Sequence, residues 1–372
     1  YSTAEAARDM DILRAALGDK KLNYFGKSYG TYLGTLYAQF FPDKVGRMIL
    51  DGALDPNISI LEQNISQAKG FDDALDAFLA DCAKQDDCPL PANKQEATLK
   101  IIALFETAAL NPLPRKTKVE NDERTATESL IVLGTASALY DDVDGWPKLR
   151  TAFLEGQQGY GDTFLDLADQ YSGRSSDGSY MSNELDSGAI IDCLDWPDTR
   201  SVEKTKADAK RFTDAAPVFG PYLAYTNISC KYLTPPDMDK LTRSTNKITS
   251  IKTAPVVVIG TTRDPATPYE FNRDRSSYAR DWTNEHPCGR GSLDPGMDQS
   301  DELEKIPTKK GPASAGPFLV EKKSLNYMFS LLTTAEKYSR FMRAMLVMEM
   351  PLGHSASHAP VLVQAPKPSE SI

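Results

Sequence analysis

At residues 22–34 the chain reads Leu-Asn-Tyr-Phe-Gly-Lys-Ser-Tyr-Gly-Thr-Tyr-Leu-Gly, which holds the pattern Gly-x-Ser-x-Gly with Ser28 at its centre. An apolar strand candidate, Leu22 to Phe25, leads into the pattern, and a helical pattern over Thr31 to Phe41 follows it. A strand, a tight turn and a helix in this order are the setting in which such a serine stands exposed as a nucleophile. The stretch therefore predicts a nucleophilic Ser28.

The residues beside Ser28 suit that role. Gly26 and Gly30 remove the side chains that would collide at a sharp turn, and glycine tolerates the backbone angles required there. The following helix starts at the serine, so its first N–H groups point at developing negative charge, and the Tyr29 N–H is predicted to be an oxyanion donor. The alternative is a chance occurrence of the pattern in a glycine-bearing turn. The flanking strand and helix favour the nucleophile.

Composition sets broad limits. The 372 residues are 41% hydrophobic and 25% charged, which is ordinary for a soluble globular protein of one large domain or two. No apolar run reaches the length of a membrane span. A net charge of −10 argues against nucleic acid and anionic membranes as partners. No signal peptide is visible, although a mature or truncated start would look the same.

The five cysteines suggest an oxidising compartment. Cys82 and Cys88 are six residues apart in a polar loop with no histidine nearby, which favours a small disulfide loop over a metal site. Cys193 and Cys230 form a candidate second pair, and two disulfides would imply an oxidising location. The alternative is five unrelated reduced thiols. We expect neither a metal nor a cofactor.

Strand and helix patterns predict an α/β fold, a parallel sheet with an inserted helical lid. Val45 to Leu50 is a second buried strand, and the order strand, helix, strand implies right-handed parallel crossovers. The predicted regions are a first part of the core (1–56), a helical lid (57–240), a second part of the core (241–358) that includes an insertion (271–333), and a tail (359–372).

Asp264 is the candidate for the carboxylate of a catalytic triad. It follows Ala254-Pro-Val-Val-Val-Ile-Gly260, a β-branched run typical of a strand buried on both faces. Open α/β sheets place their chemistry in loops at the carboxyl ends of such strands. The alternative is an aspartate that caps a turn before Pro265.

A serine nucleophile needs a base, usually a histidine held by a carboxylate. The three histidines, His286, His354 and His358, all follow Asp264, so the available order is Ser, Asp, His, as in α/β-hydrolases. His354 is favoured because it follows a strand candidate and a glycine. His286 and His358 remain open, and each histidine could also be a solvated loop residue.

Two acidic residues of the lid, Asp192 and Asp195, flank Cys193. Either carboxylate could bind the free amino group of a substrate. The alternative is that both form turns or pair with surface lysines and arginines.

Several stretches resemble the secreted tripeptidyl aminopeptidases, in the proline-iminopeptidase-like group of α/β-hydrolases. The resemblance covers roughly residues 1 to 270, and it is carried by Ala6–Arg14, Leu22–Gly34, Phe41–Gly52, the Cys82/Cys88 loop, Asp192–Pro197 and Gly260–Pro268. It implies a serine exopeptidase acting on peptide N-termini, export from the cell, Ser28 as nucleophile and Asp264 as the triad acid.

The chain departs from that family in two ways. The family carries an upstream oxyanion loop and the first sheet strands, and this sequence begins after them, so we expect a missing N-terminal segment to complete the fold. The family's histidine follows the triad aspartate by a few tens of residues, whereas His354 follows Asp264 by 90 and His286 by 22. The insertion at 271–333 would account for the distance to His354, because Thr334 to Ser355 resembles the family's last helix, strand and Gly-His loop.

The predicted function is a secreted or cell-envelope aminopeptidase that releases short peptides from free N-termini through Ser28, Asp264 and His354. Two alternatives stay open. One is an esterase or lipase-like hydrolase with the same triad, and the other is an inactive truncated hydrolase or binding protein.

Overall fold

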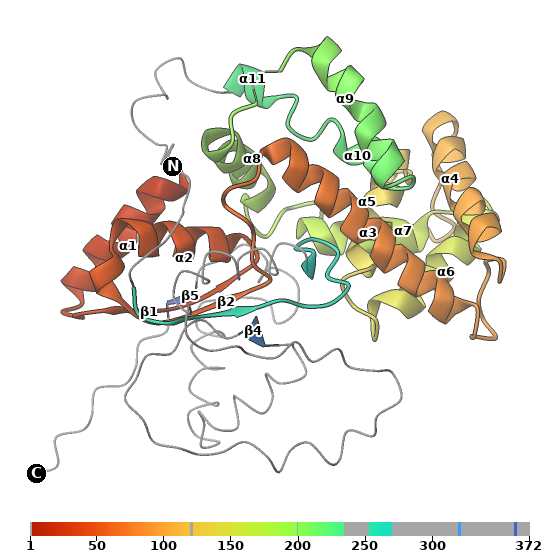
Figure 1. Cartoon of the computed structure of the whole chain (residues 1–372). Helices are drawn as coiled ribbons and strands as arrows, with labels where there is room; N and C mark the ends of the chain where they lie inside the picture. The colour runs from red at the N-terminus through yellow and green to blue at the C-terminus, as the bar shows by residue number, and fades with distance from the viewer. Residues whose placement is uncertain are drawn as a thin grey trace, which may run out of the picture.

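A computed structural model describes residues 2–119, 122–198, 200–233 and 253–269, together with two short strands at 319–320 and 361–362. A parallel sheet lies beside a larger group of helices (Figure 1). The elements in chain order are α1 (Thr3–Ala16), β1 (Leu22–Lys27), α2 (Tyr29–Phe40), the 3-10 helix η1 (Pro42–Lys44), β2 (Val45–Asp51), α3 (Ile60–Cys82), α4 (Lys94–Leu110), α5 (Glu128–Ala138), α6 (Gly145–Gln157), α7 (Asp162–Ser172), α8 (Glu184–Asp195), α9 (Val202–Ala215), α10 (Gly220–Leu223), α11 (Cys230–Leu233), β3 (Val256–Ile259), β4 (Leu319–Val320) and β5 (Val361–Leu362).

The strands form one sheet in the order β4-β3-β2-β1-β5. The pairs β1–β2, β2–β3 and β3–β4 are parallel, and β5 runs antiparallel to β1. Lys27 pairs with Asp51, which pairs in turn with Ile259, so three strands end level with one another. The predicted parallel sheet is confirmed. The strands β4 and β5 fall within the regions that the sequence analysis assigned to the insertion and the tail.

Helices α1 and α2 cover one face of the sheet (Figure 1). Alternate residues of β1 are buried, which is the pattern of a strand with one covered face. Tyr24, Leu33, Tyr37 and Met48 are among the buried side chains of this core. The prediction for β3 was only partly right, because Ile259 is buried but the preceding three valines are partly exposed. The reason is that α2 packs over β1 and β2 rather than over β3.

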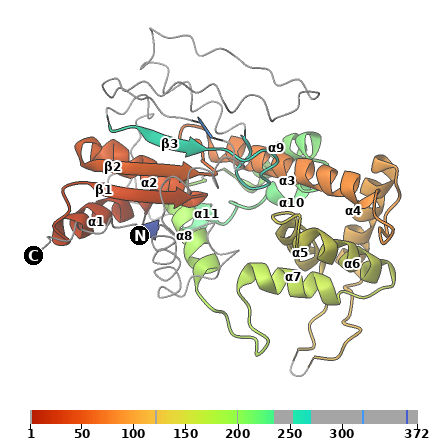
Figure 2. The same cartoon turned by 90° about the horizontal axis from the view of Figure 1, so that it is seen from below.

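The helices α3 to α7, together with Val218 and Phe219 just before α10, share a hydrophobic core of their own, beside the end of the sheet (Figure 2). Its largest buried side chains are aromatic or branched: Phe78, Phe105, Phe153, Phe164, Phe219, Ile101 and Ile131. N-cap residues mark where helices begin. The side chains of Ser59 and Asn93 accept hydrogen bonds from the backbone amides of Glu62 and Glu96, and these bonds cap the starts of α3 and α4. We call α3 to α7 and α10 the helical group. Its action as a lid stays a prediction.

Both predicted disulfides are present. Cys82–Cys88 closes the end of α3, and Cys193–Cys230 ties α8 to α11. Across the described ranges, no helix combines the length and the apolar character that crossing a membrane requires.

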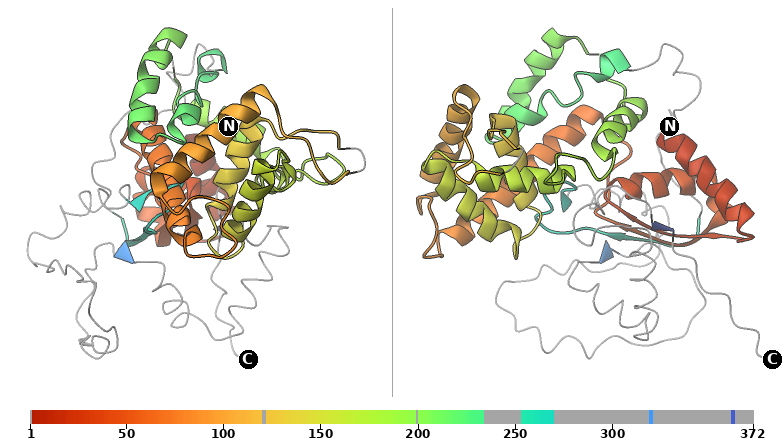
Figure 3. Two further views of the ribbon diagram at one scale, coloured as in Figure 1. Left: turned by 90° about the vertical axis from the view of Figure 1, so that its right-hand side faces the viewer. Right: turned by 180° about the vertical axis from the view of Figure 1, so that it is seen from behind.

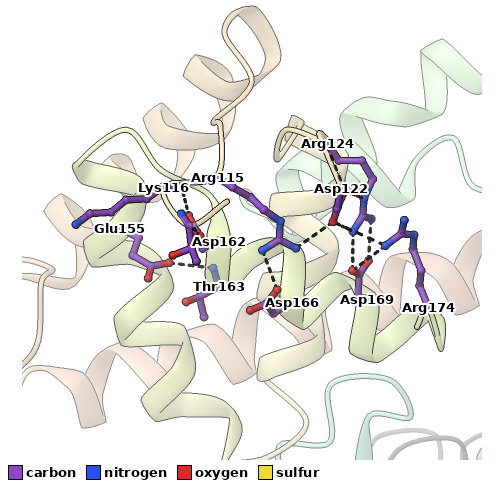
Figure 4. A network of polar contacts seen from close by, with 11 residues as sticks. Arg115, Lys116, Asp122, Arg124, Glu155, Asp162, Thr163, Asp166, Asp169 and Arg174 are labelled. Atoms are coloured by element: carbon purple, nitrogen blue, oxygen red, sulfur yellow. Dashed lines mark hydrogen bonds and ion pairs between the residues drawn. The ribbon is translucent and has the colours of Figure 1, made fainter. Parts of the chain in front are cut away.

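Arginines and aspartates join the segment 113–126 to α7 and the residues just after it (Figure 4). The Asp122 carboxylate is 2.8 Å from Arg124, 3.4 Å from Arg115 and 3.9 Å from Arg174. Asp169 also pairs with Arg124 and Arg174, at 2.6 and 3.4 Å. Hydrogen bonds from Arg124 outweigh burial and hold the pKa of Asp122 well below its usual range. We call this cluster the Arg–Asp network.

Candidate active site

Ser28 sits at the turn between β1 and α2, with φ 49° and ψ −122°. A positive φ is strained for a residue with a side chain, and such strain costs roughly 1–3 kcal/mol. Besides Ser28, Arg263 is the other non-glycine residue with a positive φ in the described part of the chain, and it directly precedes Asp264. The two strained positions therefore coincide with two predicted triad loops.

Hydrogen bonds on both sides fix the Ser28 backbone. Its amide donates to the carbonyl of Asp51 at 2.9 Å, which extends the β1–β2 ladder by one residue. Its carbonyl accepts the Thr31 amide at 2.8 Å and the Thr31 hydroxyl at 2.6 Å. The same hydroxyl accepts the Leu54 amide at 3.0 Å. These contacts tie the turn to β2 and to the loop after it, and they offset the strain.

A close approach between β1 and α2 requires glycine at position 26. A Cβ there would lie 2.4 Å from the Gly30 carbonyl oxygen, a distance that side-chain carbons essentially never reach. Beneath the turn, the buried Tyr24 hydroxyl donates to that same carbonyl at 2.6 Å. The first glycine of the pattern thus lets the helix start directly above the strand.

Tyr29 occupies the first position of α2, so its backbone N–H points out of the N-terminal end of the helix. This is the place that an oxyanion donor requires. Its side chain turns toward α1, where the hydroxyl forms a very short hydrogen bond with the Thr3 hydroxyl. Burial raises the pKa of the Tyr29 phenol, so the side chain stays neutral.

Asp264 lies in the loop after β3, and its carboxylate organises that loop. Oδ1 accepts the amides of Ala266 and Thr267 at 3.0 and 2.9 Å, and Oδ2 accepts the Thr267 hydroxyl at 2.9 Å. The turn-capping alternative therefore describes real contacts. These three hydrogen bonds do not use the full acceptor capacity of the carboxylate, which offers about four lone-pair positions.

Gly52 shows that Ser28 and Asp264 meet at the same edge of the sheet. Its φ is +66°, and a Cβ there would lie 2.8 Å from the Thr267 hydroxyl, 3.6 Å from Asp264 Oδ2 and 3.8 Å from the Ser28 amide. Both predicted residues thus lie within 4 Å of a single point. Sequence reasoning did not single out Gly52, although its position directly after the strand candidate Val45 to Leu50 and Asp51 was a readable signal.

The helical group braces the Asp264 loop. A Cβ at Gly70 of α3 would lie 2.6 Å from the Pro265 carbonyl oxygen and 3.2 Å from that of Asp264. Beside it, the Gln67 side chain donates to the Ala266 carbonyl at 3.1 Å. The predicted triad acid is therefore positioned jointly by the sheet and by α3.

The two acidic residues of α8 have different surroundings. Asp195 is buried, and its carboxylate accepts the Thr3 amide at 2.9 Å and the Thr3 hydroxyl, so it caps the start of α1. Asp192 is accessible to solvent, but desolvation by the surrounding protein and then the Asp195 charge raise its pKa to about 6. The Asp192 charge adds to the raised pKa of the Tyr29 phenol. The ring of Trp196, at the end of α8, lies 4.5 Å from the ring of Tyr32 in α2, so the end of α8 lies beside the helix that follows Ser28. Substrate binding by either residue stays a prediction.

The base cannot be placed in the same way. His286, His354 and His358 all lie outside the described residues. Within the described ranges, no side chain hydrogen bonds to Ser28 Oγ. The arrangement therefore brings together the serine, the candidate oxyanion amide and the carboxylate. The choice of His354 as the base, with His286 and His358 as alternatives, stays a prediction from the sequence.

Comparison with known proteins gives a consistent result. A family profile for the alpha/beta hydrolase fold matches residues 1–277. Serine protease Hip1 of Mycobacterium tuberculosis is 37% identical over 284 residues, which cover 75% of this chain and 53% of that protein. Carboxylesterase B of the same organism is 38% identical over 279 residues, 73% of this chain and 51% of that protein. A tripeptidyl aminopeptidase of Streptomyces lividans is 29% identical over 278 residues, 72% of this chain and 48% of that protein. The chain spans about half the length of these relatives.

Proposed function

Because the chain belongs to the alpha/beta hydrolase fold family, we propose that it supplies the catalytic edge of a serine peptidase that acts on free peptide N-termini. The observation that carries this proposal is the strained Ser28 turn, at φ 49°, with the Asp264 carboxylate at the same sheet edge. Relatives named as a serine protease and a tripeptidyl aminopeptidase support the peptidase class.

In the proposed mechanism, Ser28 Oγ attacks the carbonyl of the scissile peptide bond. His354 takes the serine proton and later gives it to the leaving amine, while Asp264 orients the imidazole. The Tyr29 amide stabilises the oxyanion, and the positive end of α2 adds to its field. The resulting acyl-enzyme is hydrolysed by water through the same groups in reverse.

Asp192 provides a reason for preferring a free N-terminus. A carboxylate near the Ser28 turn would pair with the ammonium group of the substrate's first residue. Asp195 supports it indirectly, because it fixes the start of α1 and its charge raises the Asp192 pKa. An N-acetylated peptide would leave Asp192 without its partner, so the proposal predicts a strong preference for unblocked peptides.

The direct test uses the full-length protein that contains this chain. We expect release of arylamine from unblocked tripeptidyl arylamides, weak turnover of the N-acetylated analogues, and no turnover by Ser28→Ala. Turnover of short-chain p-nitrophenyl esters together with no arylamide release would overturn the peptidase proposal in favour of an esterase.

An esterase is the second candidate, because a relative named carboxylesterase B is 38% identical over most of this chain. The Ser28 and Asp264 geometry serves either reaction, and only the leaving group differs. An inactive protein is a third possibility. Covalent labelling with a fluorophosphonate probe separates it from both enzymes, because an inactive protein would leave Ser28 unmodified.

The proposed location is outside the cytoplasm, at the cell envelope or beyond it. Two disulfides fit an oxidising compartment, since cytosolic thiols are normally kept reduced. Peptide mapping of the protein from its native source without reduction would recover Cys82 linked to Cys88 and Cys193 linked to Cys230. Recovery of free thiols at these positions would contradict the proposed location.

A further inference from the structure

Thr3, the first residue of α1, connects Tyr29 of α2 to Asp195 of α8. Its hydroxyl forms hydrogen bonds with both the Tyr29 hydroxyl and the Asp195 carboxylate. Its backbone amide donates a further hydrogen bond to the same carboxylate at 2.9 Å. Thr3 and Asp195 are both buried, so these contacts are shielded from water. Three helices that are far apart in the sequence therefore meet at one threonine side chain.

The chemistry of the three groups determines the direction of these hydrogen bonds. An ionised carboxylate only accepts hydrogen bonds, so the single hydroxyl hydrogen of Thr3 is donated to Asp195. The Thr3 oxygen therefore accepts the hydrogen of the Tyr29 hydroxyl. The connection uses the hydroxyl both as a donor and as an acceptor. Serine could replace threonine in this role, whereas valine, which has the same shape but no hydroxyl, could not.

Two aromatic rings make a second connection between α8 and α2. The ring of Trp196, directly after α8, lies 4.5 Å from the ring of Tyr32. Residues three positions apart lie on one face of a helix, so Tyr29 and Tyr32 extend from the same face of α2. Their partners at α8, Asp195 and Trp196, are adjacent in the sequence. The end of α8 is thus connected to the start of α2 at two points, through Thr3 and through the ring pair.

The position of Tyr29 matters because its backbone N–H is the candidate oxyanion donor. Ser28 is held by contacts of its backbone with β2 and with Thr31, whereas the Tyr29 side chain is held by Thr3. A donor of this kind acts only within hydrogen-bond distance of the atom on which negative charge develops. A misplacement of about 1 Å can lower a rate by about a hundredfold. The contact with Thr3 can therefore affect the reaction rate without touching the substrate.

We propose that Thr3 is a positioning residue for the oxyanion amide of Tyr29, and that Asp195 acts through Thr3. This inference rests on the proposed function, in which Ser28 is the nucleophile and the Tyr29 amide stabilises the oxyanion. By holding the Tyr29 phenol, Thr3 fixes the direction of the adjacent backbone N–H. The amide is needed when charge develops on the substrate carbonyl, so the contribution of Thr3 belongs to the chemical step and not to substrate binding.

The test replaces Thr3 in the full-length protein that contains this chain. Thr3→Val should lower kcat per titrated active site by about tenfold and leave KM unchanged, because a displaced donor loses part of its effect in the transition state. Thr3→Ser keeps the hydroxyl and should stay close to wild type. Thr135→Val is the matched control, since Thr135 is also fully buried and its hydroxyl donates at 2.8 Å within α5, in the helical group.

A second variant approaches the same hydrogen bond from its other end. Tyr29→Phe keeps the backbone amide and the ring but removes the hydroxyl that Thr3 accepts, so it should also lower kcat. Because both changes remove one shared contact, the double variant should be no slower than Thr3→Val. Losses that multiply in the double variant would overturn the inference. If Thr3→Val does not fold, Tyr29→Phe alone carries the comparison of kcat with KM.

Fluorophosphonate labelling separates positioning from stability. The phosphoryl oxygen of the probe occupies the oxyanion position, so the rate constant for labelling Ser28 should fall in Thr3→Val while the final extent of labelling of folded protein is unchanged. Fewer labelled sites at an unchanged rate, a rise in KM alone, or an equal loss of kcat in Thr135→Val would overturn the inference. Absence of Ser28 labelling in the wild type would instead overturn the proposed function.

Discussion

Aspartate side chains have opposite surroundings in the Arg–Asp network and near Ser28. In the network, Asp122 has three arginines within 4 Å, and its pKa falls well below the usual range (Figure 4). Near Ser28, desolvation and the neighbouring Asp195 raise the pKa of Asp192 to about 6. One cluster is internally neutralised, and the other places two like charges together.

This difference distinguishes a carboxylate that stabilises the fold from a carboxylate that can bind a ligand. A carboxylate with its own arginines has nothing left to offer a ligand, and it holds together the segments that carry those arginines. A carboxylate whose pKa is raised by desolvation and a like charge gains from binding a cation, and groups of this kind concentrate at functional sites. The sheet and the helical group lie side by side in the view of Figure 1 and again from behind (Figure 3, right).

The largest expected effect is at the nucleophile. Ser28→Ala should reduce kcat by about six orders of magnitude, the loss seen when a serine nucleophile is removed from a triad. The free energy of unfolding should change little, because the strained turn is held by backbone contacts and by Thr31. Active-site titration and chemical denaturation of the same preparation check both statements. A variant that keeps a tenth of the activity would exclude Ser28 as the nucleophile.

Next comes removal of the central carboxylate of the network. Asp122→Ala should lower the free energy of unfolding by about 1–3 kcal/mol, because it removes one hydrogen-bonded carboxylate from three arginines that each keep a second one, Asp166 or Asp169. Denaturant titration measures this. The lowered pKa of Asp122 also means that its contribution is present above the unfolded value near 3.8 and disappears as the pH falls through the folded pKa. The difference between wild type and variant should therefore shrink in acid.

A smaller, pH-dependent effect is expected at Asp192. Since its pKa is about 6, the carboxylate is charged above that pH, and kcat/KM for unblocked peptides should rise with pH through about 6. Asp192→Asn should remove this step and lower kcat/KM about tenfold or more at pH 7. Asp186→Asn, at an exposed position of the same helix, is the matched control. An unchanged pH profile in Asp192→Asn would contradict the amine-binding proposal.

The raised pKa has an opposite consequence for stability. Because the folded-state pKa of Asp192 is above the unfolded value of 3.8, the favourable contribution of this group is complete below that value and is lost as the pH rises through about 6. Asp192→Asn should therefore be somewhat more stable than wild type at pH 7, and denaturant titration at pH 4 and pH 7 measures the change. Equal differences at both values would show that Asp192 is not destabilised by its surroundings.

The smallest effect is expected at the rim of the network. Asp166 pairs with Arg115 at 3.0 Å, but its side chain is 68% exposed. Solvent screens such a pair, so Asp166→Ala should change the free energy of unfolding by about 1 kcal/mol or less. A loss as large as that of Asp122→Ala would mean that burial does not decide which pair matters here.

The sequence predicted the local features of the site because local chemistry determines them. The pattern around Ser28 specified the turn, since Gly26 has no alternative where a Cβ would meet the Gly30 carbonyl. The run before Gly260 located β3, and the spacing and polarity around Cys82 and Cys88 indicated their disulfide. These features depend on residues within a few positions of one another.

What the sequence by itself determined is therefore a nucleophile turn, a parallel sheet and an acid loop, each encoded in a short stretch of residues. Tertiary structure alone decided that Ser28 and Asp264 lie on either side of Gly52, and that Asp195 caps α1 while Asp192 keeps a raised pKa. The physical reason is that burial, charge neighbours and close approach arise between elements far apart in the chain, where no local pattern records them.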